Sequence, residues 1–129
     1  MTIFTINGAA VRDIASLYDE LNRVFMAEED WQLGPSLDAL NDLLYGGFGA
    51  LHGVSEAHII WTDHTISRRM LGLDTTREYY RGKLSQPQIY SAPHFRGLLE
   101  ELENGTGRTY FDIVLEVFAD HPEIELILT

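Results

Sequence analysis

The sequence predicts an α/β domain built on a compact parallel sheet of three strands. Short runs rich in β-branched and aliphatic residues occur at 2–6, 57–62 and 124–128, and helical patterns occupy the stretches between them. Strands separated by helical crossovers pair in parallel, and such crossovers are right-handed. The chain has 129 residues, 45% of them hydrophobic and 22% charged, as is typical of one globular domain. We therefore predict a single domain over residues 1–129 with the order β-α-α-β-α-insert-α-α-β.

The first half of the chain predicts a strand and two helices. The strand Thr2–Ile6 ends at the turn pair Asn7-Gly8. Asp13 is placed to cap a helix whose apolar residues recur every three or four positions: Ile14, Leu17, Tyr18, Leu21, Val24 and Phe25. Ser36 is placed to cap a second helix, and Gly46-Gly47 ends it. The buried stripe of that helix is Leu37, Leu40, Leu43 and Leu44.

The middle of the chain predicts a buried strand and a short helix. The continuous apolar run Ile59-Ile60-Trp61 is typical of a strand covered on both faces. Asp63 or Thr65 could cap a helix that reaches Leu71 and stops at Gly72.

An insert of about residues 72–108 interrupts the alternation of strands and helices. Residues 73–92 show no periodicity and contain Gly82, Pro87 and three tyrosines, so we expect a loop there. Pro93 is a good first-turn residue for a helix that turns Phe95, Leu98, Leu99 and Leu102 inward. Thr109 is placed to cap the last helix, which ends before Pro122 and the strand Ile124–Leu128.

The charge of the chain argues against direct binding to nucleic acid. The net charge is −11, and a protein that neutralises phosphates needs the opposite sign. Residues 1–67 carry −8, residues 68–96 carry +4 and residues 97–129 carry −7, so the basic residues are concentrated in the centre. The basic segment is either a solvated loop that balances an acidic body, a separate contact surface, or a segment folded back onto the acidic face.

The sequence predicts a cytoplasmic protein without cofactors. Cysteine is absent, which excludes disulfides, a thiol nucleophile and thiolate-bound zinc. Met1 is followed by a mixed segment unlike a signal peptide, and no apolar stretch approaches the ~20 residues of a membrane span. The five histidines form no close metal-binding pair, so we expect no metal site.

Asp38 and Asp42 form the most informative pair of polar residues. Four positions apart on the second predicted helix, they share one face beside the leucine stripe. Like charges at this spacing destabilise a helix by a few tenths of a kcal/mol. Such a pair is expected where the helix forms a surface patch that binds cations. The helix dipole accounts for Asp38 but less well for Asp42, and both interpretations stay open.

The common enzyme classes find little support in the sequence. A hydrolase with paired carboxylates is possible, but twenty acidic residues supply many such pairs by chance. No nucleophile elbow surrounds a serine, and the glycines of Tyr45-Gly46-Gly47-Phe48-Gly49 end a helix instead of following a strand. We expect a protein that is not an enzyme.

Several segments resemble the barstar family, intracellular inhibitors of barnase-type ribonucleases. They are Ile6-Asn7-Gly8, Val11-Arg12-Asp13-Ile14, Gly34-x-x-Leu37-Asp38-Ala39-Leu40-x-Asp42, Ile60-Trp61 followed by Ser67, Val114-Leu115-x-Val117-Phe118 and Ile124–Leu128. The Leu-Asp-Ala-Leu-x-Asp block is the most specific of them. The resemblance covers roughly residues 2–71 and 109–129, and implies three parallel strands packed with helices.

The resemblance also implies where a partner would bind. In this family the second helix and the loop before it enter the cationic active site of the nuclease. Asp38, Asp42, Asp120, Gly34 and Gly46 fall on family positions of that surface.

The aromatic positions of the surface depart from the family pattern. Asn41 stands where the family has tryptophan, Ser36 where it has asparagine, and Gly47 where it has a second tryptophan. Gln32 and Leu33 replace tyrosines, and Trp31 beside them could serve as the aromatic anchor. These changes suggest a different cationic partner, a different specificity or a loss of inhibition.

From this resemblance we expect the protein to inhibit a basic ribonuclease or related toxin, and we expect its role to be toxin immunity. Its acidic face would steer association, so the on-rate should fall as salt rises. We favour a monomer that binds neither nucleic acid nor membrane. The alternative is a structural or regulatory domain that self-associates through the 72–108 insert, with Tyr79, Tyr80 and Tyr90 at the interface.

Overall fold

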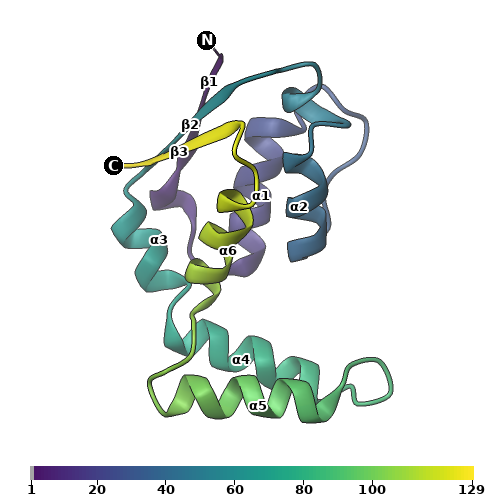
Figure 1. The fold of residues 1–129 in the computed structure, drawn as a ribbon, viewed down its shortest axis with the longest axis vertical. Coiled ribbons are helices and arrows are strands. Elements are labelled where there is room, and N and C mark those ends of the chain that lie inside the picture. Colours follow the sequence, from purple (N-terminus) through teal and green to yellow (C-terminus); the bar gives the residue numbers. More distant parts are fainter. Residues whose placement is uncertain (1) are drawn as a thin grey trace.

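Three parallel strands form the sheet of this protein (Figure 1). The structure is a computed structural model that describes residues 2–129. Strand β2 (Ala57–Thr62) lies between β1 (Thr2–Asn7) and β3 (Ile124–Leu128), and both neighbours pair with it in parallel. The predicted α/β architecture with a three-stranded parallel sheet is confirmed.

In residues 2–129, six α-helices and two short 3-10 helices connect the strands. The α-helices are α1 (Ile14–Phe25), α2 (Leu37–Leu44), α3 (His64–Met70), α4 (Leu73–Leu84), α5 (Ala92–Glu103) and α6 (Tyr110–Ala119). The 3-10 helices are η1 (Gly8–Ala10) and η2 (Gly49–Leu51).

Side-chain caps begin three of the helices as predicted. The side chains of Asp13, Ser36 and Thr109 each accept a hydrogen bond from the backbone N–H three residues later. Asp63 precedes α3 as expected, but its side chain makes no capping hydrogen bond and its φ of 49° is left-handed. The capping role predicted for Asp63 is therefore wrong.

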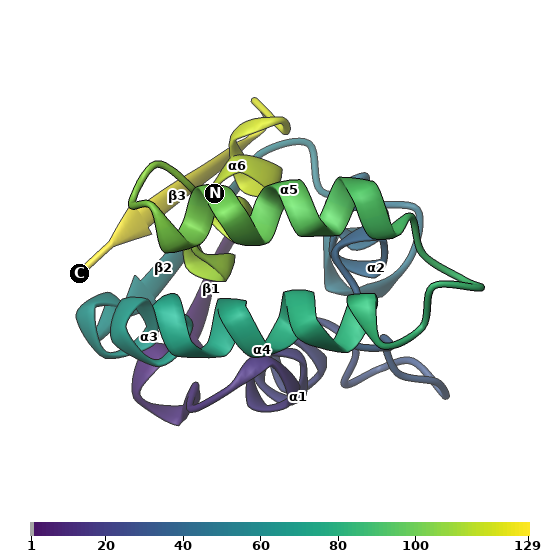
Figure 2. The same ribbon diagram turned by 90° about the horizontal axis from the view of Figure 1, so that it is seen from below.

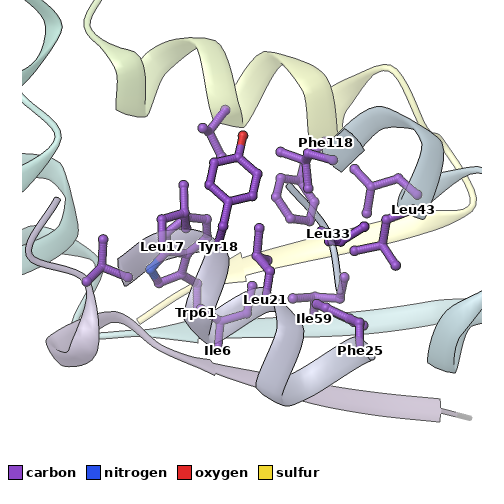
Figure 3. Close-up of a cluster of buried hydrophobic side chains, with 14 of the residues drawn as sticks. Ile6, Leu17, Tyr18, Leu21, Phe25, Leu33, Leu43, Ile59, Trp61 and Phe118 are labelled. Carbon is purple, nitrogen blue, oxygen red and sulfur yellow. The ribbon is translucent and has the colours of Figure 1, made fainter. Parts of the chain in front are cut away.

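The helices cover one face of the sheet. Ile6, Ile59 and Trp61 are fully buried and point towards α1 and α6 (Figure 3). On the opposite face Ile3 is 56% exposed and Ile60 is only half-buried. The prediction that the β2 strand is covered on both faces is wrong, because no helix in residues 2–129 packs over Ile60 closely enough to bury it.

A buried serine joins β2, α3 and η1. The hydroxyl of Ser67 accepts a hydrogen bond from the indole Nε1 of Trp61 at 2.9 Å and donates one to the carbonyl of Gly8 at 2.9 Å. Ser67 is fully buried, so these bonds satisfy groups that water cannot reach. Gly8 lies so close that any side chain there would collide with Thr62, Asp63 and Ser67.

The expected loop at 73–92 is wrong for its first twelve residues, which form α4. Thr76 and Tyr80 supply the buried positions of α4, so its inward face carries no leucine or isoleucine stripe. Ion pairs three residues apart, Asp74–Arg77 and Glu78–Arg81, lie on its outer side. A helix whose buried face is made of threonine and tyrosine has weak hydrophobic periodicity, which explains the error.

Helices α4 and α5 form an antiparallel hairpin that projects from the body of the protein (Figures 1 and 2). The hairpin is attached to α6: the hydroxyl of Thr76 accepts the backbone N–H of Tyr110 at 2.7 Å, and the rings of Tyr79 and Tyr110 meet edge to face. Helix α5, which begins around Pro93 as predicted, packs on α4 and buries Leu102. The other predicted inward residues, Phe95, Leu98 and Leu99, are only half-buried.

Replacing Ser67 tests the bridge between β2, α3 and η1. We expect Ser67→Ala to lower the free energy of unfolding by about 1–3 kcal/mol, because the Trp61 indole and the Gly8 carbonyl lose their partner in a buried site. Urea unfolding followed by tryptophan fluorescence measures the change. Ser55→Ala, at an exposed serine without a side-chain hydrogen bond in residues 2–129, should change stability by less than about 0.5 kcal/mol. Equal effects of the two substitutions would contradict the bridge.

A buried pair of tyrosines predicts a loss of stability in alkali. The hydroxyls of Tyr18 and Tyr110 are hydrogen-bonded at 2.8 Å, and burial raises the pKa of Tyr18 from 10.0 to about 12 and raises the pKa of Tyr110 as well. Above pH 10 the unfolded chain has therefore lost protons that the folded chain retains, so stability falls as pH rises from 10 towards 12. Urea midpoints across this range should fall less steeply for the double variant Tyr18→Phe/Tyr110→Phe. An unchanged slope would contradict this role of the pair.

Candidate functional site

The outer face of α2 presents two carboxylates and a tyrosine. Asp38, Asp42 and Tyr45 follow one another at intervals of four and three residues, so they lie on one stripe of the helix. All three are exposed, Tyr45 by 73%. The opposite side of α2 buries Leu40, Leu43 and Leu44 in the core, which fixes the outward direction of the stripe.

Tyr45 belongs to this candidate surface but is not among the residues predicted from the sequence. In the sequence it is the first residue of the glycine-rich segment that ends the helix. Its spacing of seven residues from Asp38 and three from Asp42 was the available signal, because that spacing continues the acidic stripe by one turn.

A buried histidine connects α2 to the residue after α6. His121 is 2% exposed, and its Nε2 lies 2.8 Å from the side-chain oxygen of Asn41 and donates a hydrogen bond to it. The ring of Tyr45 packs edge to face on the His121 ring, with centroids 4.7 Å apart. Asp120, exposed at the end of α6, is thereby held beside the C-terminal half of α2.

Asn41 therefore has a structural contact within the chain. It is half-buried, and its side-chain oxygen is engaged by His121.

The loop before α2 is pinned to α1 by one buried asparagine. The side chain of Asn22 accepts the backbone N–H of Leu33 at 2.7 Å, and its amide donates to the Leu33 carbonyl at 3.3 Å. Three residues after the pinned Leu33, the side chain of Ser36 caps α2 through the N–H of Ala39. Between them Gly34 is exposed, with no atoms close to where a side chain would begin, so its backbone is open to a partner.

Trp31, in the loop before α2, is a second exposed aromatic residue. Its ring is 45% exposed and packs on Phe48, with centroids 4.8 Å apart. An open groove of about 640 Å³ runs from Trp31 along the C-terminal half of α1 and is rich in charged side chains: Asp19, Arg23, Glu29 and Asp30.

Gly46 allows the chain to turn away from the end of α2. Its φ is +81°, a conformation that residues with side chains rarely adopt, and a side chain would press against the Leu51 carbonyl. The glycine directs the chain towards Phe48 and η2, so its contribution to the surface is the geometry of the turn.

The surface carries negative charge that the rest of the described chain does not neutralise. Among residues 2–129, none of the ion pairs involves Asp38, Asp42 or Asp120. Within the same residues, no three histidine, aspartate or glutamate side chains are grouped so that they could hold a metal ion. No helix in this part of the chain has the length and apolar character needed to cross a membrane.

Replacing Asn41 separates a structural role from a contact role. We expect Asn41→Ala to lower the free energy of unfolding by about 1–3 kcal/mol, because the buried Nε2 of His121 loses its acceptor. Asp42→Ala, one residue away and exposed, should change it by less than about 0.5 kcal/mol. Urea unfolding compares the two variants directly. Full stability of Asn41→Ala would show that the contact with His121 does not hold α2.

A comparison with known protein families identifies the family of the chain. A family model described as Barstar (barnase inhibitor) matches residues 1–80, which is more than half of the chain. The match includes α2, the loop before it and β2, and it ends within α4. No curated protein matches the chain. The chain belongs to the barstar family, whose members are inhibitors of ribonucleases and not enzymes.

Proposed function

We propose that this protein inhibits a basic ribonuclease or related toxin by placing the outer face of α2 in its cationic active site. The observation that carries the proposal is the stripe of exposed carboxylates on α2, which no cation of the described chain neutralises. Asp38 and Asp42 would occupy the places of RNA phosphates, and Asp120 would contact the rim. The protein would carry out no catalysis of its own.

Electrostatics favours this kind of partner. The net charge of −11 attracts a cationic protein at long range, and exposed carboxylates on a rigid helix then pair with its basic residues. Because Asp38 and Asp42 have no ion pair to break, they meet the partner without losing an internal contact. Inhibition of a toxin in the cytoplasm is the role that fits both the barstar family and the negative charge of the chain.

The aromatic residues would set specificity. Tyr45 follows the carboxylates at the end of α2, Trp31 lies in the loop before α2, and large aromatic side chains are common binding anchors. In place of a tryptophan at Asn41, the surface has Tyr45 packed on His121. Ser36, Gly34 and Gly46 would shape the backbone that approaches the partner. We also propose that residues 1–129 form one domain, with residues 72–108 as an insert in the family fold.

Titration against a small basic ribonuclease of the barnase type tests the proposal. Wild-type protein should abolish RNA cleavage at one equivalent. Asp42→Ala should weaken inhibition at least about thirtyfold, which is a loss of ~2 kcal/mol of binding free energy. The association rate measured by stopped flow should fall as salt rises, because screening weakens attraction between oppositely charged proteins.

A matched variant controls for the loss of charge. Glu100→Gln removes one exposed carboxylate on α5, away from α2, and should inhibit as well as wild type. If both variants lost the same amount of inhibition, the loss would be due to the change in net charge and not to a contact made by α2. Absence of inhibition by the wild-type protein would overturn the proposed function for this class of enzyme.

A further inference from the structure

The outer end of the α4–α5 hairpin is a basic surface on an acidic protein. We call residues 81–96 the hairpin tip; they contain Arg81, Lys83 and Arg96 and no aspartate or glutamate, so their charge is +3. The carboxylates of the hairpin lie nearer its base, where Arg77 pairs with Asp74 and Glu103. The positive charge of the hairpin is therefore concentrated at its tip, and its negative charge lies nearer its base.

The cations of the tip do not neutralise α2 within the same molecule. Arg81 pairs with Glu78 on its own helix, whereas Lys83 and Arg96 take part in none of the ion pairs found in residues 2–129. The ammonium of Lys83 lies 4.0 Å from the ring centre of Tyr90, so aromatic rings hold it in place. The hairpin therefore does not fold back through ion pairs onto the acidic stripe, which was one of the possibilities left open by the sequence.

The tip also exposes apolar surface. Ile89, in the loop between α4 and α5, is 63% exposed. Five large hydrophobic side chains are exposed in the described chain: Ile89 is on the tip, Trp31 is in the loop before α2, Tyr45 ends α2, and Ile3 and Leu73 lie elsewhere. Tyr80, by contrast, is 3% exposed and Tyr79 packs on Tyr110, so these two tyrosines are not the self-association surface predicted from the sequence.

The tip and α2 lie on the same side of the molecule. In Figure 1 the loop that joins α4 to α5 and helix α2 are both on the right, and Figure 2, seen from below, shows α2 behind the outer half of the hairpin. Two surfaces on one side of a chain can meet their counterparts on a second copy across a two-fold axis. Each tip then faces the carboxylates at the C-terminal end of α2 and α6 of the other copy, Asp42 and Asp120, and the two equivalent contacts form together.

We propose that two copies of this chain associate reciprocally, with the hairpin tip of each against Asp42 and Asp120 of the other. Opposite charges fix the orientation, and Ile89, Trp31 and Tyr45 become shielded from water. The net charge of −11 on each copy opposes the approach, so the dimer is weak and forms at high protein concentration. The monomer expected from the sequence is then the dilute form.

The dimer would cover the surface proposed above to bind a nuclease. A cationic partner and a second copy would compete for the same carboxylates. The dimer would therefore have to dissociate before either copy could bind a nuclease. This consequence rests on the proposed function, whereas the self-association is measurable without any nuclease.

Charge exchange between the two surfaces tests the dimer. In Lys83→Glu/Arg96→Glu both surfaces of the chain are acidic, and in Asp42→Lys/Asp120→Lys both are basic. Each variant alone should therefore lose association, with the dissociation constant raised about tenfold or more. An equimolar mixture should associate, because each acidic tip meets a basic stripe and each basic tip meets an acidic one. The two variants carry net charges of −11 − 4 = −15 and −11 + 4 = −7, so the mixture has the same total charge as two wild-type copies and a similar long-range repulsion.

Sedimentation velocity of the full chain over a wide range of concentration provides the readout. Asp42 and Asp120 are near helix C-termini, where lysine is favourable, and circular dichroism checks that each variant is folded. Arg12→Glu/Arg69→Glu is the control: it changes the net charge by the same amount as the tip variant, at exposed residues on other elements, and should associate like wild type.

The possible outcomes are distinct. Loss of association in each reversed variant and its recovery in the mixture would support the reciprocal dimer. A wild-type protein that stays monomeric at the highest concentration would overturn it, as would a mixture that fails to associate or a control as impaired as the tip variant. Inhibition of a ribonuclease by a strictly monomeric protein would leave the proposed function standing and remove only the dimer.

Discussion

Parallel pairing of the three strands is the constraint on which the rest of the structure depends. A parallel strand can be added only after the chain has crossed back over the sheet, and helices make each of these crossings. Ile6, Ile59 and Trp61 all point to one face, so α1 and α6 collect there and the opposite face stays open. Helix α2 packs beside α6 at the edge of this layer, which leaves its outer side free.

A few polar contacts hold α2 and the loop before it in place. Asn22 holds the loop before α2, Ser36 starts the helix, and the His121–Asn41 bond ties its C-terminal half to the end of α6. Carboxylates on an element held at both ends lose little conformational freedom when they bind, and rigid presentation of this kind favours affinity. The acidic stripe is therefore a product of contacts made by uncharged side chains behind it.

The hairpin of α4 and α5 lies outside the layer that covers the sheet. Its attachment to α6 goes through Thr76, Tyr79 and Tyr110, at the end of the layer away from the sheet. The chain leaves after α3 and returns at the start of α6, so the hairpin takes no part in the pairing of the strands. The hairpin brings the only strongly basic segment of the chain to the side where α2 lies.

The sequence by itself determined the strands, five of the six helices and the acidic pair on α2. Those features come from local signals: β-branched runs, leucine spacing, and capping residues such as Asp13 and Thr109. Only the tertiary structure decided that residues 73–84 are helical, because their buried face consists of Thr76 and Tyr80, whose apolar character depends on the partners they meet. It also decided that Asn41 bonds to His121, 80 residues away, and that Tyr45 joins the stripe. Contacts between residues far apart in the chain have no periodicity to reveal them, so folding alone brings them together.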